Sequence, residues 1–538
     1  PPAPPANALP PPPAAHAHPL LPAPQPRGPA PPALDGDRRP DLLTGDSGPW
    51  PGSVRTPRPA AAVLYRNAGD GRFEDVTAGA GLGPGLYGQG VATGDFDSDG
   101  RPDLFITAVG PNRLYRNLGG GRFEDVTAAA GVAGAADAWS TSAAFLDYDR
   151  DGDLDLFVLN YVEWSRELDF EVDYRLAGIG RAYGPPTNFP GTHAWLYRND
   201  DGRFTDVSAE AGVQVANPAT GQPAGKGLAL RVDDPDDDGW PDVIVANDTV
   251  RNFFFRNRGG RFEESGIATG IAFDNSGGAT GAMGIDAARA GTDGHYAVAI
   301  GNFANEMTSF FVAPDASLLF TDEAIVAGIG PPTRLVLSFG LFFFDADLDG
   351  RLDLLQANGH GEDDINLVQA SQQHRQPAQL FWDCGGCPRQ YVELPAELLG
   401  DLPQPLVGRG AAYADYDGDG DLDVVLSQAG GPPRLLRNDQ AHEHSWLRLL
   451  LVEEGPTRDA LGARVRLLAG GRVQERRVAP TRSYLSQVEL PLTFGLPAGD
   501  APVTVEVRWP DGTIETFDQV PGLREVEIRR GTGAAPAG

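Results

Sequence analysis

The chain has 538 residues, and 43 Lys plus Arg against 74 Asp plus Glu give it a formal net charge of -31. That balance argues against a nucleic-acid-binding surface, which needs a basic patch, and it favours a solvated surface that keeps a protein soluble. The longest apolar run, Leu335–Phe344, is about half as long as a membrane-spanning helix. We therefore predict no transmembrane segment and interpret this run as a pair of buried strands.

Residues 1–33 are mostly Pro and Ala, a composition that favours polyproline II structure and cannot form a hydrophobic core. We predict that this N-terminal segment is a disordered spacer. The alternative is a tail that docks on a partner. The sequence shows no signal peptide, so the route of any export stays open.

An acidic motif, D-x-D-x-D-G-x-x-D, recurs along the chain, and an apolar run follows each full copy. Alternating carboxylates, a Gly that permits a sharp turn and a backbone carbonyl are the oxygen donors that suit a hard divalent cation. An EF-hand would need Glu at the twelfth position and helices on both sides. In the clearest copy, residues 415–423, the twelfth position is Leu426 and both flanks are β-like. Each copy therefore predicts a strand, a metal loop and a second strand.

We predict that each loop binds one cation through the side chains of its first, third, fifth and ninth residues and the backbone carbonyl of its seventh. The predicted ligands are Asp95, Asp97, Asp99, Arg101 and Asp103; Asp147, Asp149, Asp151, Asp153 and Asp155; Asp234, Asp236, Asp238, Trp240 and Asp242; Asp345, Asp347, Asp349, Arg351 and Asp353; and Asp415, Asp417, Asp419, Asp421 and Asp423.

The alternative is a set of solvated acidic loops that hold no ion. Two carboxylates about 4 Å apart repel by roughly 1 kcal/mol in bulk water and by about 4 kcal/mol at an effective dielectric of 20. Four of them in one compact loop therefore favour a bound dication. We predict about five structural Ca2+ sites, because Mg2+ prefers to keep its water. Worn copies lie near Asp35 and Asp286; we expect no metal near Asp286, and the sequence leaves the copy near Asp35 open.

A second motif, Leu-Tyr-Arg-Asn followed by Gly-Arg-Phe, accompanies the loops, for example at residues 114–117 and 121–123. Asn and Gly between apolar runs indicate a β-hairpin. Each unit thus predicts a four-stranded antiparallel sheet. The step from Asp242 to Asp353 is about twice the step from Asp103 to Asp155, so a degenerate unit containing Asp286 should lie between them. We predict an all-β fold, a seven-bladed β-propeller over residues 34–440 with cation-binding hairpin loops.

An insertion at Val162–Thr192 interrupts the repeats and is interpreted either as a binding loop or as a structural plug. Residues 445–530 predict a compact β-sandwich-like domain without acidic loops, and residues 531–538 form a tail. Its expected strands are Trp446–Val452, Ala463–Ala469, Val473–Val478, Tyr484–Leu490, Val503–Trp509, Ile514–Phe517 and Val526–Arg529.

Cys384 and Cys387 are the two cysteines and lie on a predicted hairpin tip, C-G-G-C. We predict a local disulfide, with free thiols as the alternative. Pro388 excludes the His that c-type haem attachment requires. The chain carries no H-E-x-x-H, G-x-S-x-G or P-loop pattern. His360, in the segment Asn-Gly-His-Gly, is interpreted as a satisfied turn residue, so no catalytic residue is predicted.

Together these motifs resemble the FG-GAP/VCBS-repeat propellers, whose loops are similar to the calcium hairpins of integrin α-subunits. The C-terminal residues resemble the ASPIC/UnbV module at 459–465 (DALGARV), 484–487 (YLSQ), 494–496 (FGL) and 507–512 (VRWPDG). The combination resembles a bacterial relative of the cartilage acidic protein family. The resemblance implies a non-enzymatic calcium propeller that is extracellular, at the cell surface or periplasmic.

Two classes of function follow. The first is a secreted or surface-exposed recognition, adhesion or scaffolding protein that binds a protein or a glycan. The alternative is a calcium-dependent polysaccharide-active enzyme, lyase-like, on the same fold. A cluster of His, Arg, Lys or Tyr side chains converging on one propeller face would favour the enzyme.

Overall fold

The computed structural model describes residues 34–45, 62–69, 71–83, 86–291, 293–439, 444–453, 459–499 and 501–535. The predicted N-terminal spacer, residues 1–33, lies outside the described residues, as do the last three residues of the predicted tail. The predicted all-β class is confirmed, because the described helices are short connectors between strands. They are α1 (Thr127–Ala130), α2 (Arg166–Val172), α3 (Ser208–Ala211), α4 (Gly266–Thr269), α5 (Ala324–Ala327), α6 (Gly330–Thr333), α7 (Ile365–Val368), η1 (Thr77–Gly79), η2 (Pro186–Asn188) and η3 (Ala396–Leu398).

Seven antiparallel sheets follow one another in the described part of the chain. They are β1 (Leu42–Gly45), β2 (Ala62–Gly69) and β3 (Arg72–Asp75); β4 (Tyr87–Gly94), β5 (Asp103–Val109), β6 (Arg113–Gly119) and β7 (Arg122–Asp125); β8 (Ser140–Leu146), β9 (Asp155–Asn160), β12 (Trp195–Asp200) and β13 (Arg203–Asp206); β14 (Gly227–Asp233), β15 (Asp242–Asn247), β16 (Phe253–Asn257) and β17 (Phe262–Glu264); β18 (Ala282–Ala290), β19 (His295–Asn302), β20 (Ser309–Ala313) and β21 (Thr321–Asp322); β22 (Ser338–Phe344), β23 (Asp353–Asn358), β24 (Gln379–Asp383) and β25 (Tyr391–Glu393); and β26 (Gly408–Ala414), β27 (Asp423–Gln428) and β28 (Arg434–Leu436).

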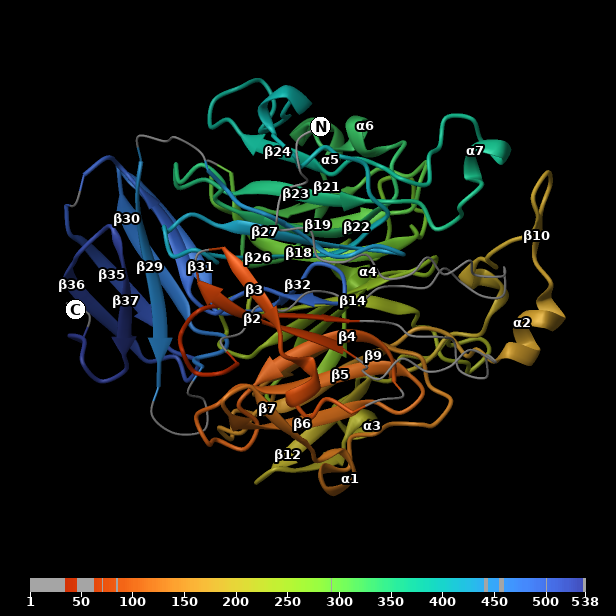
Figure 1. The fold of residues 1–538 in the computed structure, drawn as a ribbon, viewed down its shortest axis with the longest axis horizontal. Helices are drawn as coiled ribbons and strands as arrows, with labels where there is room; N and C mark the ends of the chain where they lie inside the picture. The colour runs from red at the N-terminus through yellow and green to blue at the C-terminus, as the bar shows by residue number, and fades with distance from the viewer. Residues whose placement is uncertain are drawn as a thin grey trace.

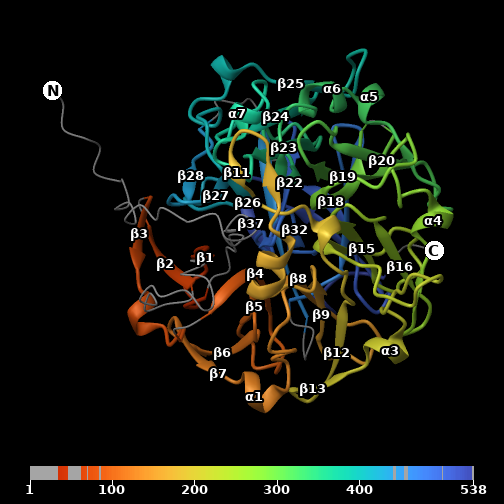
Figure 2. The same ribbon diagram turned by 90° about the vertical axis from the view of Figure 1, so that its right-hand side faces the viewer.

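The sheets are arranged around a common axis, as Figure 2 shows. The first strand of each sheet lies innermost and contacts the first strand of the next, from β4 to β8 and on to β26. Buried residues fill these inner strands, whereas the short outer strand β7 is exposed at every position except Phe123. The second strands, which the predicted metal loops lead into, are buried as well; β9, for example, is buried throughout. A strand buried on both faces is expected to be an apolar run, as the sequence after each loop is. The β-propeller prediction is confirmed.

One hydrogen bond recurs between neighbouring sheets. The Asn that ends the Leu-Tyr-Arg-Asn motif donates its Nδ2 to the backbone carbonyl at the second position of the preceding sheet's loop. The bonds are Asn117 to Leu34 (3.2 Å), Asn199 to Phe96 (2.8 Å), Asn257 to Tyr148 (2.7 Å), Asn438 to Ala346 (2.9 Å) and Asn67 to Tyr416 (2.8 Å). The last of these joins the first sheet to the last sheet. Because β1–β3 and β26–β28 have three strands each in the described residues, closure as seven equal blades stays a prediction.

Replacing Asn199 by Ala should destabilise the ring. Asn199 is fully buried, donates to Leu154 O as well as Phe96 O, and accepts from Gly202 N. Each buried group left unpaired costs about 1–3 kcal/mol, so we expect a clear fall in the free energy of unfolding measured by urea titration. Asp200→Ala, at the next and exposed position of the strand, is the control and should change little. If both variants were equally stable, the hydrogen bonds of Asn199 between neighbouring sheets would not stabilise the ring.

The fifth sheet, β18 to β21, is the degenerate unit predicted between Asp242 and Asp353, but it corrects the placement of Asp286 in a loop. That residue lies in the middle of β18, paired with Ala299 of β19, and not in a degenerate metal loop. It is fully buried and forms ion pairs with Arg231 and Arg482. The run Leu335–Phe344 is also corrected, because it supplies one strand, β22, after a turn and not a strand pair.

The predicted insertion at residues 162–192 lies between β9 and β12. It contains α2, the short hairpin β10 (Arg175–Leu176) and β11 (Gly180–Arg181), and η2. Ser165 caps α2, since its side chain accepts a hydrogen bond from Leu168 N. The insertion projects from the propeller face opposite the C-terminal domain (Figure 1).

The C-terminal domain, residues 444–535, is a sandwich of two sheets. One has the order β34 (Leu492–Leu496), β29 (Ser445–Val452) and β37 (Arg524–Arg529); the other has the order β31 (Arg472–Arg477), β30 (Arg464–Ala469), β35 (Val503–Arg508) and β36 (Ile514–Val520). Phe494, Trp509 and aliphatic residues from both sheets form its core. The sandwich prediction is confirmed.

The predicted strand Tyr484–Leu490 is wrong. Its place is taken by a tight hairpin, β32 (Thr481–Arg482) and β33 (Ser486–Gln487), whose turn has positive φ at Ser483 (68°) and Leu485 (55°). This hairpin, residues 481–487, enters the middle of the ring, and we call it the axial plug. Its contacts come from five different sheets, through β4, β14, β18, β22 and β26, so they could not be read from local sequence.

Backbone and side-chain hydrogen bonds hold the axial plug in the ring. Ser483 exchanges backbone hydrogen bonds with Ile285 of β18, and Leu341 N of β22 donates to Ser483 Oγ at 3.1 Å. Gln487 Oε1 accepts from Thr93 N of β4 at 2.8 Å. The C-terminal domain therefore fills the propeller axis from its own side of the ring.

Candidate metal centres

The five full acidic loops connect the first and second strands of their sheets and share one backbone shape. The fourth and sixth positions have positive φ in each loop, and glycine stands at the sixth. The fourth-position residues are Ser98, Arg150, Asp237, Leu348 and Gly418, with φ between 57° and 79°. The chain therefore turns sharply twice within each loop, which directs alternate side chains to the same side.

Carboxylate oxygens converge inside these loops. One oxygen from each of three residues lies within 4.8 Å of the others in five groups: Asp95, Asp97 and Asp99; Asp147, Asp149 and Asp155; Asp234, Asp236 and Asp238; Asp345, Asp347 and Asp349; and Asp415, Asp417 and Asp423. Ca2+ binds oxygen at about 2.3–2.6 Å, so two ligands on opposite sides of the ion are roughly 5 Å apart. The spacing fits a dication of that size.

Several carboxylate oxygens of the five loops are buried without a hydrogen-bond partner in the described residues. They are Oδ1 of Asp97, Asp147, Asp149, Asp234, Asp236, Asp345 and Asp421, and Oδ2 of Asp242. In Asp345 the second oxygen accepts from Gly350 N at 2.9 Å, so protein donors hold one side of the carboxylate and leave the other bare. A buried unpaired carboxylate oxygen is costly, and a cation among them would remove that cost. The residues fit a metal ion.

The electrostatics of the loops point the same way. Burial, together with the neighbouring carboxylates Asp151 and Asp149, raises the pKa of Asp147 to about 7. Burial raises the pKa of Asp103 to about 8, and that of Asp155 to about 9, above their ordinary range. A bound dication would favour the charged form of each carboxylate.

The ninth Asp of each loop has a structural role that the sequence did not reveal. In Asp155, Oδ2 accepts from Tyr148 N at 3.0 Å and Oδ1 accepts from Asn199 N at 2.8 Å. Asp103, Asp353 and Asp423 make the equivalent pair of bonds. The ninth residue thus ties the loop to the third strand, and it joins the converging oxygens in two of the five loops.

The seventh position is less uniform than the motif suggests. The Arg101 and Arg351 side chains form ion pairs with the fifth-position carboxylates Asp99 and Asp349. Metal binding by the carbonyls of Arg101, Asp153, Trp240, Arg351 and Asp421 stays a prediction.

Sequence reasoning also missed the role of the Arg in Leu-Tyr-Arg-Asn. Arg116 Nε lies 2.6 Å from Asp97 Oδ2, and Arg256 pairs with Asp236 in the same way. In the sixth sheet Trp382 Nε1 donates to Asp347 Oδ2 at 2.9 Å. These donors hold Oδ2 of the third-position Asp. The fixed spacing between the acidic motif and the Leu-Tyr-Arg-Asn motif was the sequence signal for this contact.

The worn loop near Asp35 is organised without a converging group of acidic oxygens in the described residues. Asp35 accepts from Asp37 N, and the Arg39 guanidinium pairs with Asp37. An arginine of the loop itself therefore balances its charge.

Comparison with known families now identifies the two parts of the chain. Residues 34–106 and 95–158 match the FG-GAP-like repeat family, and residues 453–535 match the family described as ASPIC and UnbV. The protein carries FG-GAP-like repeats and an ASPIC/UnbV domain. We use the second name below for the whole C-terminal sandwich, residues 444–535.

The chain is also similar to cartilage acidic protein 1. It is 27% identical to the Homo sapiens protein over 315 residues, which is 57% of this chain and 43% of that protein. It is 28% identical to the Xenopus tropicalis protein over 325 residues, 58% of this chain and 45% of that protein. The chain thus spans less than half the length of these curated relatives.

Solved structures with some likeness to the FG-GAP-like chain include a lectin of Agrocybe aegerita that recognises non-reducing terminal N-acetylglucosamine. It has a TM-score of 0.41 and 15% identity over 74% of this chain and 92% of the lectin. YCF48 from Cyanidioschyzon merolae has a TM-score of 0.40 and 9% identity over 78% of this chain and 98% of its own. Scores this low carry no argument about function.

The propeller face opposite the ASPIC/UnbV domain is where the enzyme alternative predicts a cluster of His, Arg, Lys or Tyr side chains. Polar groups do gather near the axis there, among them Lys226, His360 and Arg409, but their exposed fractions are 7%, 4% and 0%. Burial and the Arg409 charge lower the pKa of His360 to about 4. Arg409 Nη1 donates to the carbonyls of Gly359 and Gly408, and the guanidinium lies over the Phe339 ring, while Nε and Nη2 make no hydrogen bond with the described residues. The three side chains are therefore largely closed to solvent in the folded chain.

Two further features complete the site description. Cys384 and Cys387 form a disulfide on the turn between β24 and β25. Among the helices of the described residues, none combines the length and apolar character needed to cross a bilayer.

Proposed function

We propose that the protein is a secreted or surface-exposed calcium-binding propeller that acts as a non-enzymatic recognition, adhesion or scaffolding protein. The observation that carries the proposal is the convergence of carboxylate oxygens within 4.8 Å in five loops, together with bare buried oxygens on converging residues in four of them. Ca2+ would be bound by the first, third, fifth and ninth residues and the seventh carbonyl of each loop, and would hold the loops in shape.

A location outside the cytoplasm is consistent with two features. Extracellular calcium modules work with dissociation constants of about 10⁻⁴–10⁻³ M, which only an environment rich in Ca2+ would fill. A disulfide such as Cys384–Cys387 persists in oxidising compartments and is rare in reducing ones.

The partner would bind on the face opposite the ASPIC/UnbV domain. That domain covers the face with the metal loops, and the axial plug fills the centre, whereas α2 and its hairpin project from the other side (Figure 1). Phe170 of α2 is 43% exposed, and the guanidinium groups of Arg166 and Arg181 lie over its ring. An exposed aromatic ring flanked by Arg suits a protein or a glycan.

A pull-down with the immobilised chain tests this function. Surface extracts should yield a retained protein or glycan in Ca2+ that is released by EGTA, and Phe170→Ala should lower its recovery. Phe273→Ala, at an exposed position outside the insertion, is the control. Cleavage of a polysaccharide by the purified chain, with no partner retained, would contradict a recognition role.

A further inference from the structure

The five candidate metal loops differ in what contacts their first carboxylate. In the loops that begin at Asp95 and Asp147, the contacts among described residues come from the loop's own backbone N–H groups. In the loops that begin at Asp234, Asp345 and Asp415, side chains or backbone of the ASPIC/UnbV domain also contact this carboxylate. The first carboxylates thus form two groups, two that the ASPIC/UnbV domain does not contact among the described residues and three that it does. The loop that begins at Asp147 meets the domain elsewhere, because Arg150 Nη2 donates to Pro510 O at 3.1 Å.

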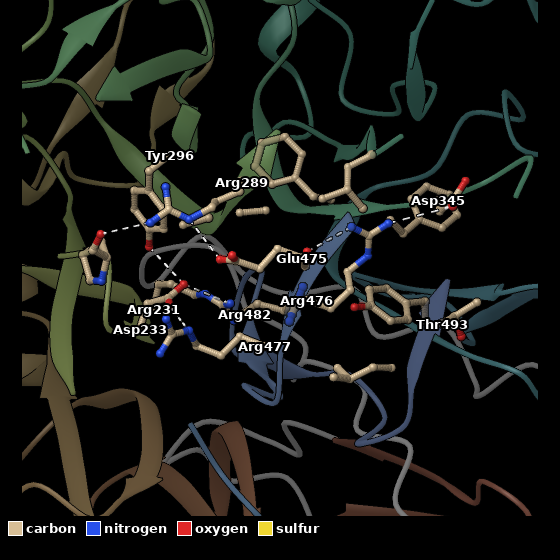
Figure 3. A pocket seen from close by; sticks show the side chains of 18 of the residues that line it. Arg231, Asp233, Arg289, Tyr296, Asp345, Glu475, Arg476, Arg477, Arg482 and Thr493 are labelled. Carbon is tan, nitrogen blue, oxygen red and sulfur yellow. Dashed lines mark hydrogen bonds and ion pairs between the residues drawn. The ribbon is translucent and has the colours of Figure 1, made fainter. Parts of the chain in front are cut away.

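Asp345 shows the contact with the domain most clearly. Arg476 Nη2 lies 3.8 Å from its Oδ2 (Figure 3). The same oxygen accepts from Gly495 N of the ASPIC/UnbV domain at 3.1 Å. Its Oδ1 is one of the bare buried oxygens. One carboxylate therefore faces the ASPIC/UnbV domain with one oxygen and the candidate metal site with the other.

Asp234 repeats this arrangement, because Arg477 contacts its Oδ2 and its Oδ1 is bare. Asp415 differs, because Arg448 contacts its Oδ2 while its Oδ1 accepts from Gly418 N of the loop at 2.7 Å. Arg448 Nε lies 3.3 Å from Asp415 Oδ2, and Arg448 is itself fixed by two hydrogen bonds to Glu489. Arg477 Nη1 lies 3.6 Å from Asp234 Oδ2, and its Nε lies 2.7 Å from Asp233 Oδ1 (Figure 3). The side chains of Arg448 and Arg477 are 4% and 12% exposed, so solvent screens these contacts weakly.

Loop carbonyls add to the same interface. Arg472 Nη1 donates to Asp349 O at 3.3 Å, and Arg508 Nη1 donates to Asp237 O at 3.0 Å. Both bonds require the loop backbone to keep its shape, which a bound ion would fix. Groups that orient a metal-binding carboxylate from behind typically change metal affinity by about 10–100-fold when removed.

We propose that Arg448, Arg476 and Arg477 are positioning residues that couple metal occupancy of three loops to docking of the ASPIC/UnbV domain. The coupling rests on the calcium binding proposed above. It is reciprocal: the docked domain orients the three carboxylates for the ion, and the ion holds the loops in the shape that the domain contacts.

Calorimetric titration of the full chain with Ca2+ tests the coupling. The triple variant Arg448→Gln, Arg476→Gln and Arg477→Gln should bind about three ions 10–100-fold more weakly, and its other two sites should be unchanged. Arg466→Gln is the matched control, because Arg466 is 46% exposed and pairs within its own domain with Glu475 and Glu506. Unchanged affinity at all sites of the triple variant would overturn the proposal.

A measurement on the unaltered chain covers the case in which the triple variant does not fold. Hydrogen–deuterium exchange of peptides spanning 472–477 and 481–487 should quicken when EGTA removes Ca2+. Equal exchange with and without Ca2+ would overturn the coupling even if calorimetry detects binding. If the unaltered chain binds no Ca2+ at all, the proposed function fails instead, so the two failures are distinguishable.

Discussion

Removal of Ca2+ with EGTA should lower the unfolding temperature of the purified chain by more than about 10 °C. An ion present at 100 times its dissociation constant stabilises the folded state by about 2.7 kcal/mol per site, and 1 kcal/mol shifts the unfolding temperature of a domain by roughly 2–4 °C. Several sites together therefore give a large effect. Differential scanning calorimetry in Ca2+ and in EGTA measures it.

Loop variants make that experiment specific. Asp236→Asn removes the charge of a third-position carboxylate with a bare buried oxygen and should reduce the stabilisation by Ca2+. Asp200→Asn, an exposed acidic residue outside the converging groups, should not. An unfolding temperature indifferent to chelation, with no metal found by elemental analysis, would refute the calcium proposal.

Replacing Tyr484 by Ala should destabilise the chain by about 3–5 kcal/mol, the usual cost of deleting a large buried aromatic side chain. Tyr484 is fully buried at the tip of the axial plug, with its ring centre 4.9 Å from that of Phe339. It shares one apolar cluster with Trp139, Leu228 and Met283, which come from different sheets. Urea unfolding followed by circular dichroism measures the loss.

Tyr484→Phe is the matched control for that variant. The Tyr484 hydroxyl is buried and makes no hydrogen bond with the described residues, so its removal should leave stability unchanged or slightly raised. If Tyr484→Ala unfolded at the same urea concentration as the unaltered chain, the axial plug would not support the ring.

Much of the fold could be predicted from local pattern. A nine-residue acidic loop followed by an apolar run marks a strand–loop–strand unit wherever it recurs, and these units became the sheets. Asp286 was misplaced because the fifth sheet lacks the acidic loop, and the segment Gly284-Ile-Asp286 resembles a remnant of that loop. Its actual partners, Arg231 and Arg482, are brought together by the fold and not by the sequence.

The axial plug could not be predicted for a related reason. Residues 484–490 alternate between apolar and polar types like an ordinary strand, but Ser483 contacts Leu341, 142 residues away. The candidate metal residues were easier, since loop spacing alone places them together. Two roles were missed: Asn199 joins two sheets, and Arg116 orients the Asp97 carboxylate. Both depend on contacts with a neighbouring strand or sheet.

The order of synthesis gives the axial plug one more consequence. The ribosome completes residues 34–439, and so all seven sheets, before residues 481–487 emerge. Domains tend to fold as they emerge, so a nascent ring would pass through a stage in which Leu228 and Phe339, later covered by Tyr484, face an empty centre. A chain truncated before the hairpin would be held at that stage, with its apolar centre exposed to water, and it would tend to aggregate.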